Sequence, residues 1–418
     1  MTAAEPSPQP PAGAPQPLQR LRVLDVSQVM AGPFCCMLLA DMGADVIKVE
    51  PPGVGDQTRG AMGFRLKGAD SGGFLALNRN KRSVALDLKT DAGREIFYAL
   101  VRTADILVEN NRPGVTARLK IDYPTLAAIN PRLVYASISG FGQTGPWAER
   151  PGFDLIAQAM SGVMSATGYP GLPPVKNTVP VADLGAGMFA VYAILSAIIG
   201  REITGRGQHI DASLYETAAA LSIWETAEYF GTGHVPTPIG SANRMSAPYQ
   251  AVQAKDGYLV IGAANQKLWL SLCEVMGRAD LADDPRFATN VDRLANRPAL
   301  IEEIEKVFAA RTAEDWTQAL LAAGVPAAPI YTYAQSLASE QAKARDLVVE
   351  MGHPVEGTIR LLGFPVKLSG TPQQLRRPPP LLGEHNDELL AELGLAPPAQ
   401  GAERADAPPA KTAAGAAS

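Results

Sequence analysis

The sequence predicts an α/β protein with a large parallel-sheet domain and a smaller α+β domain. Strand-like and helix-like segments alternate through residues 20–139, and a β-hairpin pattern followed by helices begins after residue 231. The length of 418 residues also exceeds what one hydrophobic core usually serves. Because strands that alternate with helices form a parallel sheet with helices on both faces, we expect a Rossmann-like sheet in the large domain.

The elements of the large domain follow from short apolar runs bounded by turn residues and from apolar positions at helical spacing. In chain order we expect strand 22–26, helix 32–42, strand 44–50, strand 83–88, helix 91–103, strand 105–109, helix 124–129, strand 133–139, a long apolar helix 184–200, strand 208–211 and a helical stretch 214–230. The long helix is short for a bilayer and contains several glycines, so we expect it to be buried rather than to span a membrane.

The smaller domain opens with a hairpin signal. Lys255-Asp-Gly257 separates two apolar segments, 249–253 and 258–262, and helical patterns follow at 266–276, 299–309 and 312–323. The expected organisation is a Pro/Ala-rich disordered tail over 1–19, the large domain over 20–230, the small domain over 231–329, a return to the large domain over 330–395 and a second disordered tail over 396–418.

The composition is that of an ordinary globular enzyme. The net charge is −5 with acids and bases mixed along the chain, which argues against a dedicated nucleic-acid binder. The three cysteines have neither metal nor disulfide spacing, and the four histidines are scattered. We therefore expect no metal site and a reducing compartment, the cytoplasm.

Residues 139–147 contain Gly140, Gly142 and Gly145 in the G-x-G-x-x-G spacing of a dinucleotide-binding loop. Such a loop requires a strand before it and a helix that opens directly after it. Segment 133–139 is strand-like, but Pro146 and the following residues continue as loop. The sequence thus favours a glycine-rich turn at a strand end over an NAD site.

Unusual residues gather after the strands of the expected sheet, in segments 29–33, 51–59, 110–118 and 140–154. Ligands of such sheets bind beyond the carboxyl ends of the strands, so a site is expected there. Asp183 stands where the N-cap of the long helix belongs, and a helix N-terminus favours its ionised form.

Two readings of Asp183 remain open from the residues alone. The carboxylate is a helix cap and nothing more, or it is an exposed, ionised nucleophile in a groove where Gly185 and Gly187 leave room for a substrate.

A set of motifs, in order, resembles the class III CoA-transferases, the formyl-CoA transferase and carnitine CoA-transferase family. The resemblance covers about residues 18–395 and rests on Val29-Met-Ala-Gly-Pro33, Ala44-Asp-Val-Ile-Lys-Val-Glu50, Gly55-Asp-Gln-Thr-Arg59, Asn80-Lys-Arg-Ser83, Val108-Glu-Asn110 with Arg112-Pro-Gly114, Gly140-Phe-Gly-Gln-Thr-Gly-Pro146, Ala182-Asp-Leu184 and Thr204-Gly-Arg-Gly-Gln208. Segments 247–250, 255–258 and 377–383 look most like succinate–hydroxymethylglutarate-type dicarboxylate CoA-transferases.

The resemblance implies that Asp183 is the nucleophile, which forms a mixed anhydride and then an aspartyl-CoA thioester. Backbone N–H groups around Gly140 and Gly142 are candidate oxyanion donors. Asp154 either caps the helix that follows it or orients the site. The related α-methylacyl-CoA racemases, the alternative function, place a catalytic histidine where this chain has Phe153, which cannot transfer a proton.

The resemblance also implies a coenzyme A site, with the CoA thioester as substrate and no tightly bound cofactor. The residues that match the family's CoA contacts are Met30 and Ala31 at the adenine end, Lys89 and Arg118 at the phosphates, Leu86 and Asn110 along the nucleotide or pantetheine, and Arg150 as a further candidate. Pro51 and Asn111 depart from the family pattern, where relatives carry an arginine and an aromatic residue.

The donor is expected to be succinyl-CoA and the acceptor a dicarboxylic acid, with Arg244 or Arg65 as a partner for the distal carboxylate. Oxalate and formyl-CoA are disfavoured because the run of glycines found in formyl-CoA transferase is missing from this sequence. The resemblance further implies an interlocked homodimer.

Overall fold

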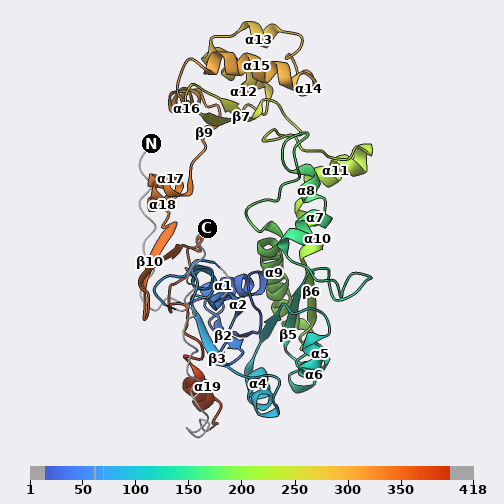
Figure 1. Cartoon of the computed structure of the whole chain (residues 1–418), viewed down its shortest axis with the longest axis vertical. Helices are drawn as coiled ribbons and strands as arrows, with labels where there is room; N and C mark the ends of the chain where they lie inside the picture. Colours follow the sequence, from blue (N-terminus) through green and yellow to red (C-terminus); the bar gives the residue numbers. More distant parts are fainter. Residues whose placement is uncertain (1–14, 61–62, 69, 396–418) are drawn as a thin grey trace, which may run out of the picture. The chain divides into compact units, whose positions relative to one another are not determined.

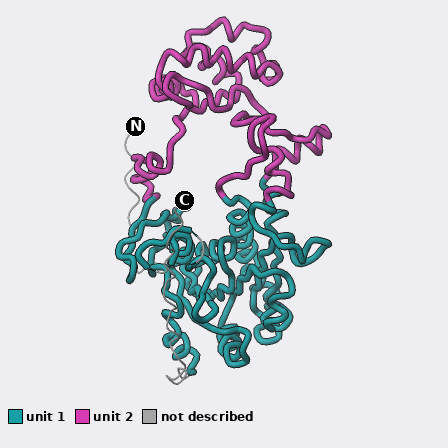
Figure 2. The backbone as a smooth tube through the Cα atoms, viewed as in Figure 1, with its two compact units in different colours: residues 1–157, 180–221, 348–418 teal, residues 158–179, 222–347 magenta. Residues whose placement is uncertain are grey.

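The computed structural model describes residues 15–60, 63–68 and 70–395 (Figure 1). The chain forms two compact units (Figure 2): unit 1 comprises Met1–Ala157, Pro180–Leu221 and Val348–Ser418, and unit 2 comprises Gln158–Val179 and Ser222–Leu347. These units differ from the expected domains in three places. Gln158–Val179, expected in the large domain, belongs to unit 2. The expected helical stretch 214–230 is two helices divided at Ser222, and the return to the large domain begins only with the hairpin that starts at Val348.

Unit 1 is built on a six-stranded sheet in which all neighbouring strands are parallel, as predicted. Its strands are β1 (Arg22–Asp25), β2 (Asp45–Glu50), β3 (Lys81–Ala85), β4 (Ile106–Glu109), β5 (Val134–Ser139) and β6 (His209–Ser213). The spatial order is β3-β2-β1-β4-β5-β6. The chain therefore reverses direction across the sheet between β1 and β4, which is the topological switch point where such sheets bind ligands.

The helices of unit 1 are α1 (Ala31–Asp41), α2 (Gln57–Gly60), α3 (Gly72–Leu77), α4 (Asp91–Thr103), α5 (Val115–Arg118), α6 (Tyr123–Ile129), α9 (Val181–Thr204), α10 (Leu214–Leu221) and α19 (Asn386–Glu392), and α7 (Asp154–Met160) begins in unit 1 and ends in unit 2. Helices α1, α4, α9, α10 and α19 pack on strands of the sheet. On one face Leu24 is paired in register with Ile47 and Leu107, and these side chains pack with Phe97 of α4 and Leu389 of α19. Helix α1 packs against α9, and α4 packs against α6.

Among the described residues, α9 is the one helix that is long and apolar enough to cross a membrane. It packs against α1, α10, β5 and β6 within unit 1. One face of α9 is therefore buried within unit 1, as expected, whereas Met188, Tyr192, Ile199 and Ile203 on this helix are exposed.

The end of the chain returns to unit 1 through the antiparallel hairpin β10 (Val348–His353) and β11 (Gly357–Leu362). Ile359 and Leu361 of β11 pack on Phe74 and Leu75 of α3.

Unit 2 holds a three-stranded antiparallel sheet, β7 (Tyr249–Gln253), β8 (Tyr258–Gly262) and β9 (Ala327–Pro329), which includes the expected hairpin. Its helices are α8 (Val163–Ala166), α11 (Ile223–Thr232), α12 (Gln266–Met276), α13 (Asp280–Asp283), α14 (Asn290–Ala295), α15 (Arg297–Phe308), α16 (Ala313–Ala322), α17 (Tyr333–Ala338) and α18 (Glu340–Ala344). The core of the unit includes Trp269 and Phe287 together with the stacked rings of Phe308 and Trp316.

Two sequence expectations need correction. Strand β3 is Lys81–Ala85 rather than 83–88, because the charge of Lys81 is buried and paired with Asp25 at 2.8 Å, so a charged residue begins a core strand. The expected disordered tails over 1–14 and 396–418 lie outside the described residues, but residues 15–19 are not a free tail. The side chain of Gln16 is buried and Leu18 donates its N–H to the carbonyl of Met42.

Candidate active site

A cavity of about 250 Å³ opens at the carboxyl ends of β1, β4 and β5, beside the starts of α1 and α9. All the residues that line it belong to unit 1: Gln28, Val29, Met30, Ala31, Gln57, Asn110, Asn111, Arg112, Pro113, Ile138, Ser139, Gly140, Arg150, Gly152, Phe153, Asp183 and Leu214. Since β1 and β4 flank the topological switch point, the fold brings the loops after them together at the expected place.

Asp183 faces this cavity from the first turn of α9. It is the third residue of the helix, whose N-cap is Pro180, so the expectation that Asp183 is itself the N-cap is wrong. The side chain is half-buried rather than exposed. Burial, with a smaller effect of the nearby Asp154 carboxylate, raises the pKa of Asp183 from 3.8 to about 7, so the expected stably ionised carboxylate is also corrected.

Asp154 provides the cap that Asp183 does not. It is the first residue of α7, is 8% exposed, and its Oδ1 accepts hydrogen bonds from the N–H groups of Ala182 (2.9 Å) and Asp183 (3.4 Å). Asp154 therefore caps the start of α9. One of its two predicted roles was to cap only the helix that follows it, α7. Asp154 is not among the residues that line the cavity, and the contacts of its carboxylate are to the backbone at the start of α9.

The two glycines of α9 have a different role from the one expected. A Cβ on Gly185 would lie 2.7 Å from Thr217 of α10, and a Cβ on Gly187 would lie 2.8 Å from the carbonyl oxygen of Ala31. These positions allow α9 to pack closely on α10 and α1, and they do not open space for a substrate.

The glycine-rich turn after β5 lines the cavity without a helix behind it. No helix begins between residues 140 and 153, which confirms the prediction against a dinucleotide loop. The N–H of Gly142 donates to Ser139 Oγ at 3.0 Å, so it is engaged within the turn and the expectation of a free oxyanion donor there is corrected. Gly140 lines the cavity.

The turn is in backbone contact with the segment that carries Arg150, Phe153 and Asp154. A Cβ on Gly152 would lie 2.7 Å from the Cα of Gly140, and one on Gly140 would lie 2.9 Å from the Cα of Gly152. Only two glycines allow the backbones to cross this closely.

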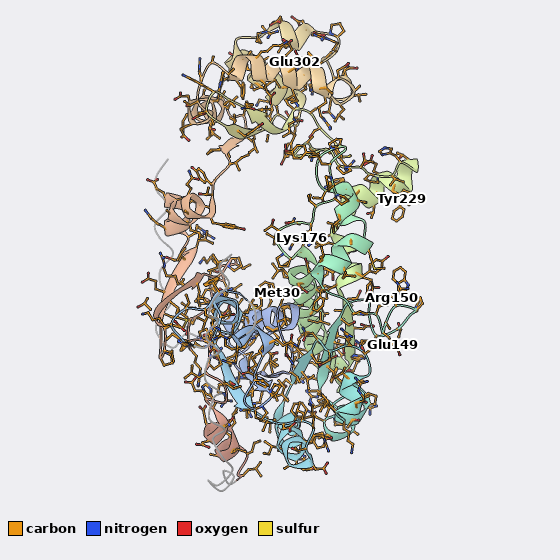
Figure 3. The ribbon with its side chains drawn as sticks, viewed as in Figure 1. Met30, Glu149, Arg150, Lys176, Tyr229 and Glu302 are labelled. Atoms are coloured by element: carbon orange, nitrogen blue, oxygen red, sulfur yellow. The ribbon has the colours of Figure 1, made fainter. Side chains whose placement is uncertain are left out.

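The structure places some of the residues expected to bind CoA at the cavity and others away from it. Met30, Ala31, Asn110 and Arg150 line the cavity (Figure 3 labels Met30, where α1 begins, and Arg150, on the loop after β5). The guanidinium of Arg150 lies 4.9 Å from the ring centroid of Trp147.

Three other residues expected to bind CoA are not brought to the cavity. Leu86 packs in the core of unit 1, and the exposed Lys89 and Arg118 are not among the lining residues.

Asn110 has a defined local role. Its Oδ1 accepts the N–H of Gln28 (2.8 Å), and its Nδ2 donates to the carbonyl of Gln28 (2.7 Å). The side chain thus ties the loop after β4 to the loop after β1.

Neither residue expected to hold a distal carboxylate lies in the cavity. Arg244, in unit 2, faces Glu225 and Glu228 and donates to the carbonyl of Thr237, while Arg65 donates to the carbonyl of Gly60. The exposed Arg112 lines the cavity instead. It belongs to the Arg112-Pro-Gly114 motif, but no role was predicted for it from the sequence. Arg112 lies three residues beyond β4, and its place in the loop after that strand was the signal in the sequence that could have identified it.

Sequence reasoning also missed Gln28, Gln57 and Ser139, which likewise follow or end strands and line the cavity. No group of three or more His, Cys, Asp or Glu residues suited to a metal occurs in the part of the chain that the structure describes.

Comparison with known proteins shows a match to the family model of CoA-transferase family III over residues 18–386. The acetyl-CoA:oxalate CoA-transferase of Acetobacter aceti is 42% identical over 91% of this chain and 97% of its own length. The succinate–glutarate CoA-transferase of Agrobacterium fabrum is 39% identical over 90% and 96%. A crystal structure of a CAIB/BAIF family protein from Brucella suis superposes with a TM-score of 0.80 at 39% identity, covering 90% of this chain and 99% of that one.

Proposed function

The chain belongs to CoA-transferase family III, and on this premise we propose that it moves CoA from a succinyl-CoA-type donor to a free dicarboxylic acid through covalent intermediates on Asp183. One observation carries the proposal: the chain places a single half-buried aspartate at the cavity formed by the carboxyl ends of β1, β4 and β5.

The chemistry follows from an ionised Asp183. Its carboxylate attacks the carbonyl carbon of the donor thioester, and CoA leaves as a thiolate, which gives a mixed anhydride. The thiolate then attacks the aspartyl carbonyl of the anhydride, which releases the donor acid and leaves an aspartyl-CoA thioester. The acceptor carboxylate attacks this thioester and displaces the CoA thiolate, which gives a second anhydride. The thiolate then attacks the acyl carbonyl of that anhydride, which frees product acyl-CoA and the carboxylate of Asp183.

Each tetrahedral intermediate carries an oxyanion that needs a donor. Gly140 is the candidate from the glycine turn, because it lines the cavity, whereas the N–H of Gly142 is engaged with Ser139.

Proton transfer next to the thioester, as in a racemase, is disfavoured by the same cavity. Phe153 lines it at 67% exposure, and none of its lining residues is a histidine.

A CoA molecule is larger than this cavity, so its acyl and pantetheine end would enter while the nucleotide lies outside. Lys89 and Arg118 remain proposed phosphate partners, and both are exposed. Arg112 and Arg150 are the cations at the cavity, so we assign the distal carboxylate of the acceptor to one of them in place of Arg244 or Arg65.

The acceptor is proposed from the relatives' names. They include glutarate and mesaconate transferases with succinyl-CoA donors, and the oxalate transferase at 42% identity weakens the expectation against oxalate. A panel of these three acids, each offered with succinyl-CoA and with acetyl-CoA and read by mass spectrometry, ranks the substrates.

We also propose a homodimer in the cytoplasm. Helix α9 exposes an apolar stripe at helical spacing, Met188, Tyr192, Ile199 and Ile203, of which Ile203 is 86% exposed, and a second copy of the chain would cover it. The three cysteines are free and buried, which suits a reducing compartment. Sedimentation velocity tests the dimer; a monomer at micromolar concentration would contradict it.

The covalent mechanism is tested with acyl-CoA alone. After incubation and digestion, the peptide that contains Asp183 should carry either a CoA thioester, with a mass increase of CoA less one water, or an acyl group in place of the carboxyl hydrogen. Asp183→Asn and Asp183→Ala should show neither the adduct nor acyl exchange while they still bind CoA. Substantial turnover by either variant would exclude Asp183 as the nucleophile.

A further inference from the structure

Val29 adopts a backbone conformation that its side chain disfavours. Its φ is 71°, and of the described non-glycine residues with positive φ it is the one with a branched Cβ, the others being Asn80, Lys120 and Asp346. A β-branched residue in this region is a steric outlier. Because Val29 lines the cavity that Asp183 faces, the unfavourable conformation lies in the proposed active site.

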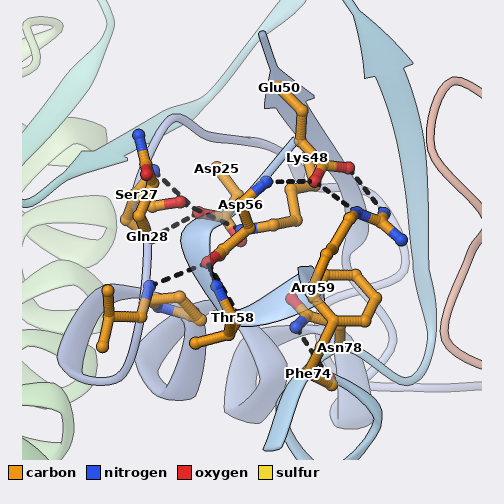
Figure 4. Close-up of polar contacts among 12 residues, drawn as sticks. Asp25, Ser27, Gln28, Lys48, Glu50, Asp56, Thr58, Arg59, Phe74 and Asn78 are labelled. Atoms are coloured by element: carbon orange, nitrogen blue, oxygen red, sulfur yellow. Dashed lines mark hydrogen bonds and ion pairs between the residues drawn. The ribbon is translucent and has the colours of Figure 1, made fainter. Parts of the chain in front are cut away.

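Hydrogen bonds from two sides hold the chain in this conformation (Figure 4). Asp56 Oδ1 accepts the N–H of Val29 at 3.2 Å. On the preceding residues, Lys48 Nζ donates to the carbonyl of Ser27 at 3.0 Å, and Asn110 makes two hydrogen bonds to the backbone of Gln28.

Asp56 and Lys48 form a buried ion pair. Asp56 Oδ2 lies 2.8 Å from Lys48 Nζ, and both side chains are fully buried. The contact is an ion pair rather than a well-aligned hydrogen bond. Asp25 lies 3.8 Å from Lys48 and 2.8 Å from Lys81, so two cations and two anions balance beneath the loop. Such a cluster is rigid, because separating any of its charges would leave another unpaired in the interior.

The conformation of Val29 sets the start of α1. Met30 and Ala31 follow it, and α1 begins at Ala31 with Met30 as a cap that makes no side-chain hydrogen bond. The carbonyl oxygen of Ala31 would be 2.8 Å from a Cβ on Gly187, so this start is packed against the second turn of the helix that carries Asp183. A change of φ at Val29 would move Met30 and Ala31 relative to Asp183.

We propose that the Lys48–Asp56 pair is a positioning device that holds Val29 in its left-handed conformation and so fixes the cavity wall, residues 28–31, against which acyl-CoA binds. This inference rests on the proposed function only for the identity of the ligand. Asp56 touches no reacting atom and acts through Val29.

A double substitution tests the proposal by rescue. Asp56→Ala removes the acceptor for the N–H of Val29, so Val29 should relax to negative φ. If about a tenth of the molecules keep the conformation that binds CoA, the dissociation constant for CoA should rise about tenfold. Adding Val29→Gly should restore the constant to within about threefold of wild type, because glycine adopts positive φ without help.

The matched control is Asp56→Ala with Val29→Ala. Alanine removes the same methyl groups but keeps the Cβ that disfavours positive φ, so CoA binding should stay weak. A purely structural role for Asp56 predicts no difference between the two double variants, because the unpaired Lys48 remains in both.

Calorimetric titration with free CoA measures binding without turnover. The proposal is overturned if Asp56→Ala binds CoA like wild type, or if the glycine and alanine double variants bind it equally. If Asp56→Ala does not fold, Asp56→Leu, which is close in shape to aspartate and has no acceptor for the N–H of Val29, replaces it, and the same ranking of the glycine and alanine partners is required. A wild type that binds CoA but exchanges no acyl groups would refute the proposed function alone and leave this comparison intact.

Discussion

Asp154→Asn should move the acidic limb of the pH–rate profile to lower pH. The substitution keeps an oxygen that accepts the N–H groups of Ala182 and Asp183, and asparagine caps helices as well as aspartate does. It removes the negative charge that, after burial, is the second cause of the raised pKa of Asp183. The carboxylate of Asp183 should therefore form at lower pH, and with it the active enzyme.

The size of the effect follows from the pKa of Asp183. It rises from 3.8 to about 7. As the smaller of two causes, Asp154 accounts for less than about half of this, and we take roughly one pH unit. At pH 6 about 9% of a group with pKa 7 is ionised, against about 50% for pKa 6, so kcat/KM at pH 6, taken as a fraction of each enzyme's own high-pH plateau, should rise about fivefold. Near pH 8 both forms are almost fully ionised.

The assay is succinyl-CoA to glutarate exchange, with kcat/KM measured from pH 5 to pH 9. Glu149→Gln is the matched control, since it removes an exposed carboxylate from the loop that precedes Asp154, and its profile should coincide with that of wild type. A lower plateau for Asp154→Asn at high pH is expected as well, because a less basic carboxylate is a weaker nucleophile. An acidic limb that stays in place, or moves to higher pH, would refute this account of Asp183.

Three further outcomes are expected. Asp183→Asn should stabilise the fold at pH 8 by roughly 1–3 kcal/mol, which allows for solvent screening of an upper bound of about 4 kcal/mol. Near pH 4 it should stabilise the fold by almost nothing, because a carboxyl group whose pKa is raised by folding lowers stability only above its pKa in the unfolded chain. Urea unfolding at both pH values measures this, and an equal effect at both would contradict it. Gly152→Ala should lower the free energy of unfolding by about 1–3 kcal/mol and remove most of the exchange activity, because its Cβ would lie 2.7 Å from the Cα of Gly140. The control Gly231→Ala, whose Cβ would meet nothing within 4 Å, should change neither stability nor activity. Thermal unfolding with activity checks the pair, and equal behaviour would remove the role given to the crossing. Arg112→Gln should raise KM for glutarate about tenfold with little change in kcat, as loss of a charge-assisted hydrogen bond does; an unchanged KM assigns the distal carboxylate to another cation.

The sheet could be predicted from sequence because its strands are apolar runs. The predicted strand 83–88 began two residues and ended three residues after the observed β3, Lys81–Ala85. The buried charge of Lys81 is neutralised by Asp25, which lies far away in sequence. Pairing of buried charges depends on tertiary contacts, and a sequence window does not contain them.

The site shows the same division. The loops after the strands were predicted to meet, and the cavity lies there with Asp183 at its edge. The cap of α9 was assigned to the wrong aspartate, because the residue that accepts the N–H of Ala182 is Asp154, 28 residues earlier. Helix capping is read from neighbours in sequence, and here the capping side chain comes from another helix.

Two unfavourable features face the same cavity, the left-handed Val29 and the half-buried Asp183 with its raised pKa. Both features lower the free energy of unfolding of the free protein, and in both the state that the proposed function uses is the one of higher free energy. Asp183 must be ionised to attack a thioester in the proposed mechanism. Val29 must keep its positive φ to hold Met30 and Ala31 beside Asp183. Neither Lys48 nor Asp56, the buried pair beneath Val29, lines the cavity. Substitutions that relieve either feature should therefore stabilise the protein, and they should differ in function. Asp183→Asn removes the proposed nucleophile, whereas Val29→Gly keeps the positive φ that we propose the site requires and should retain CoA binding.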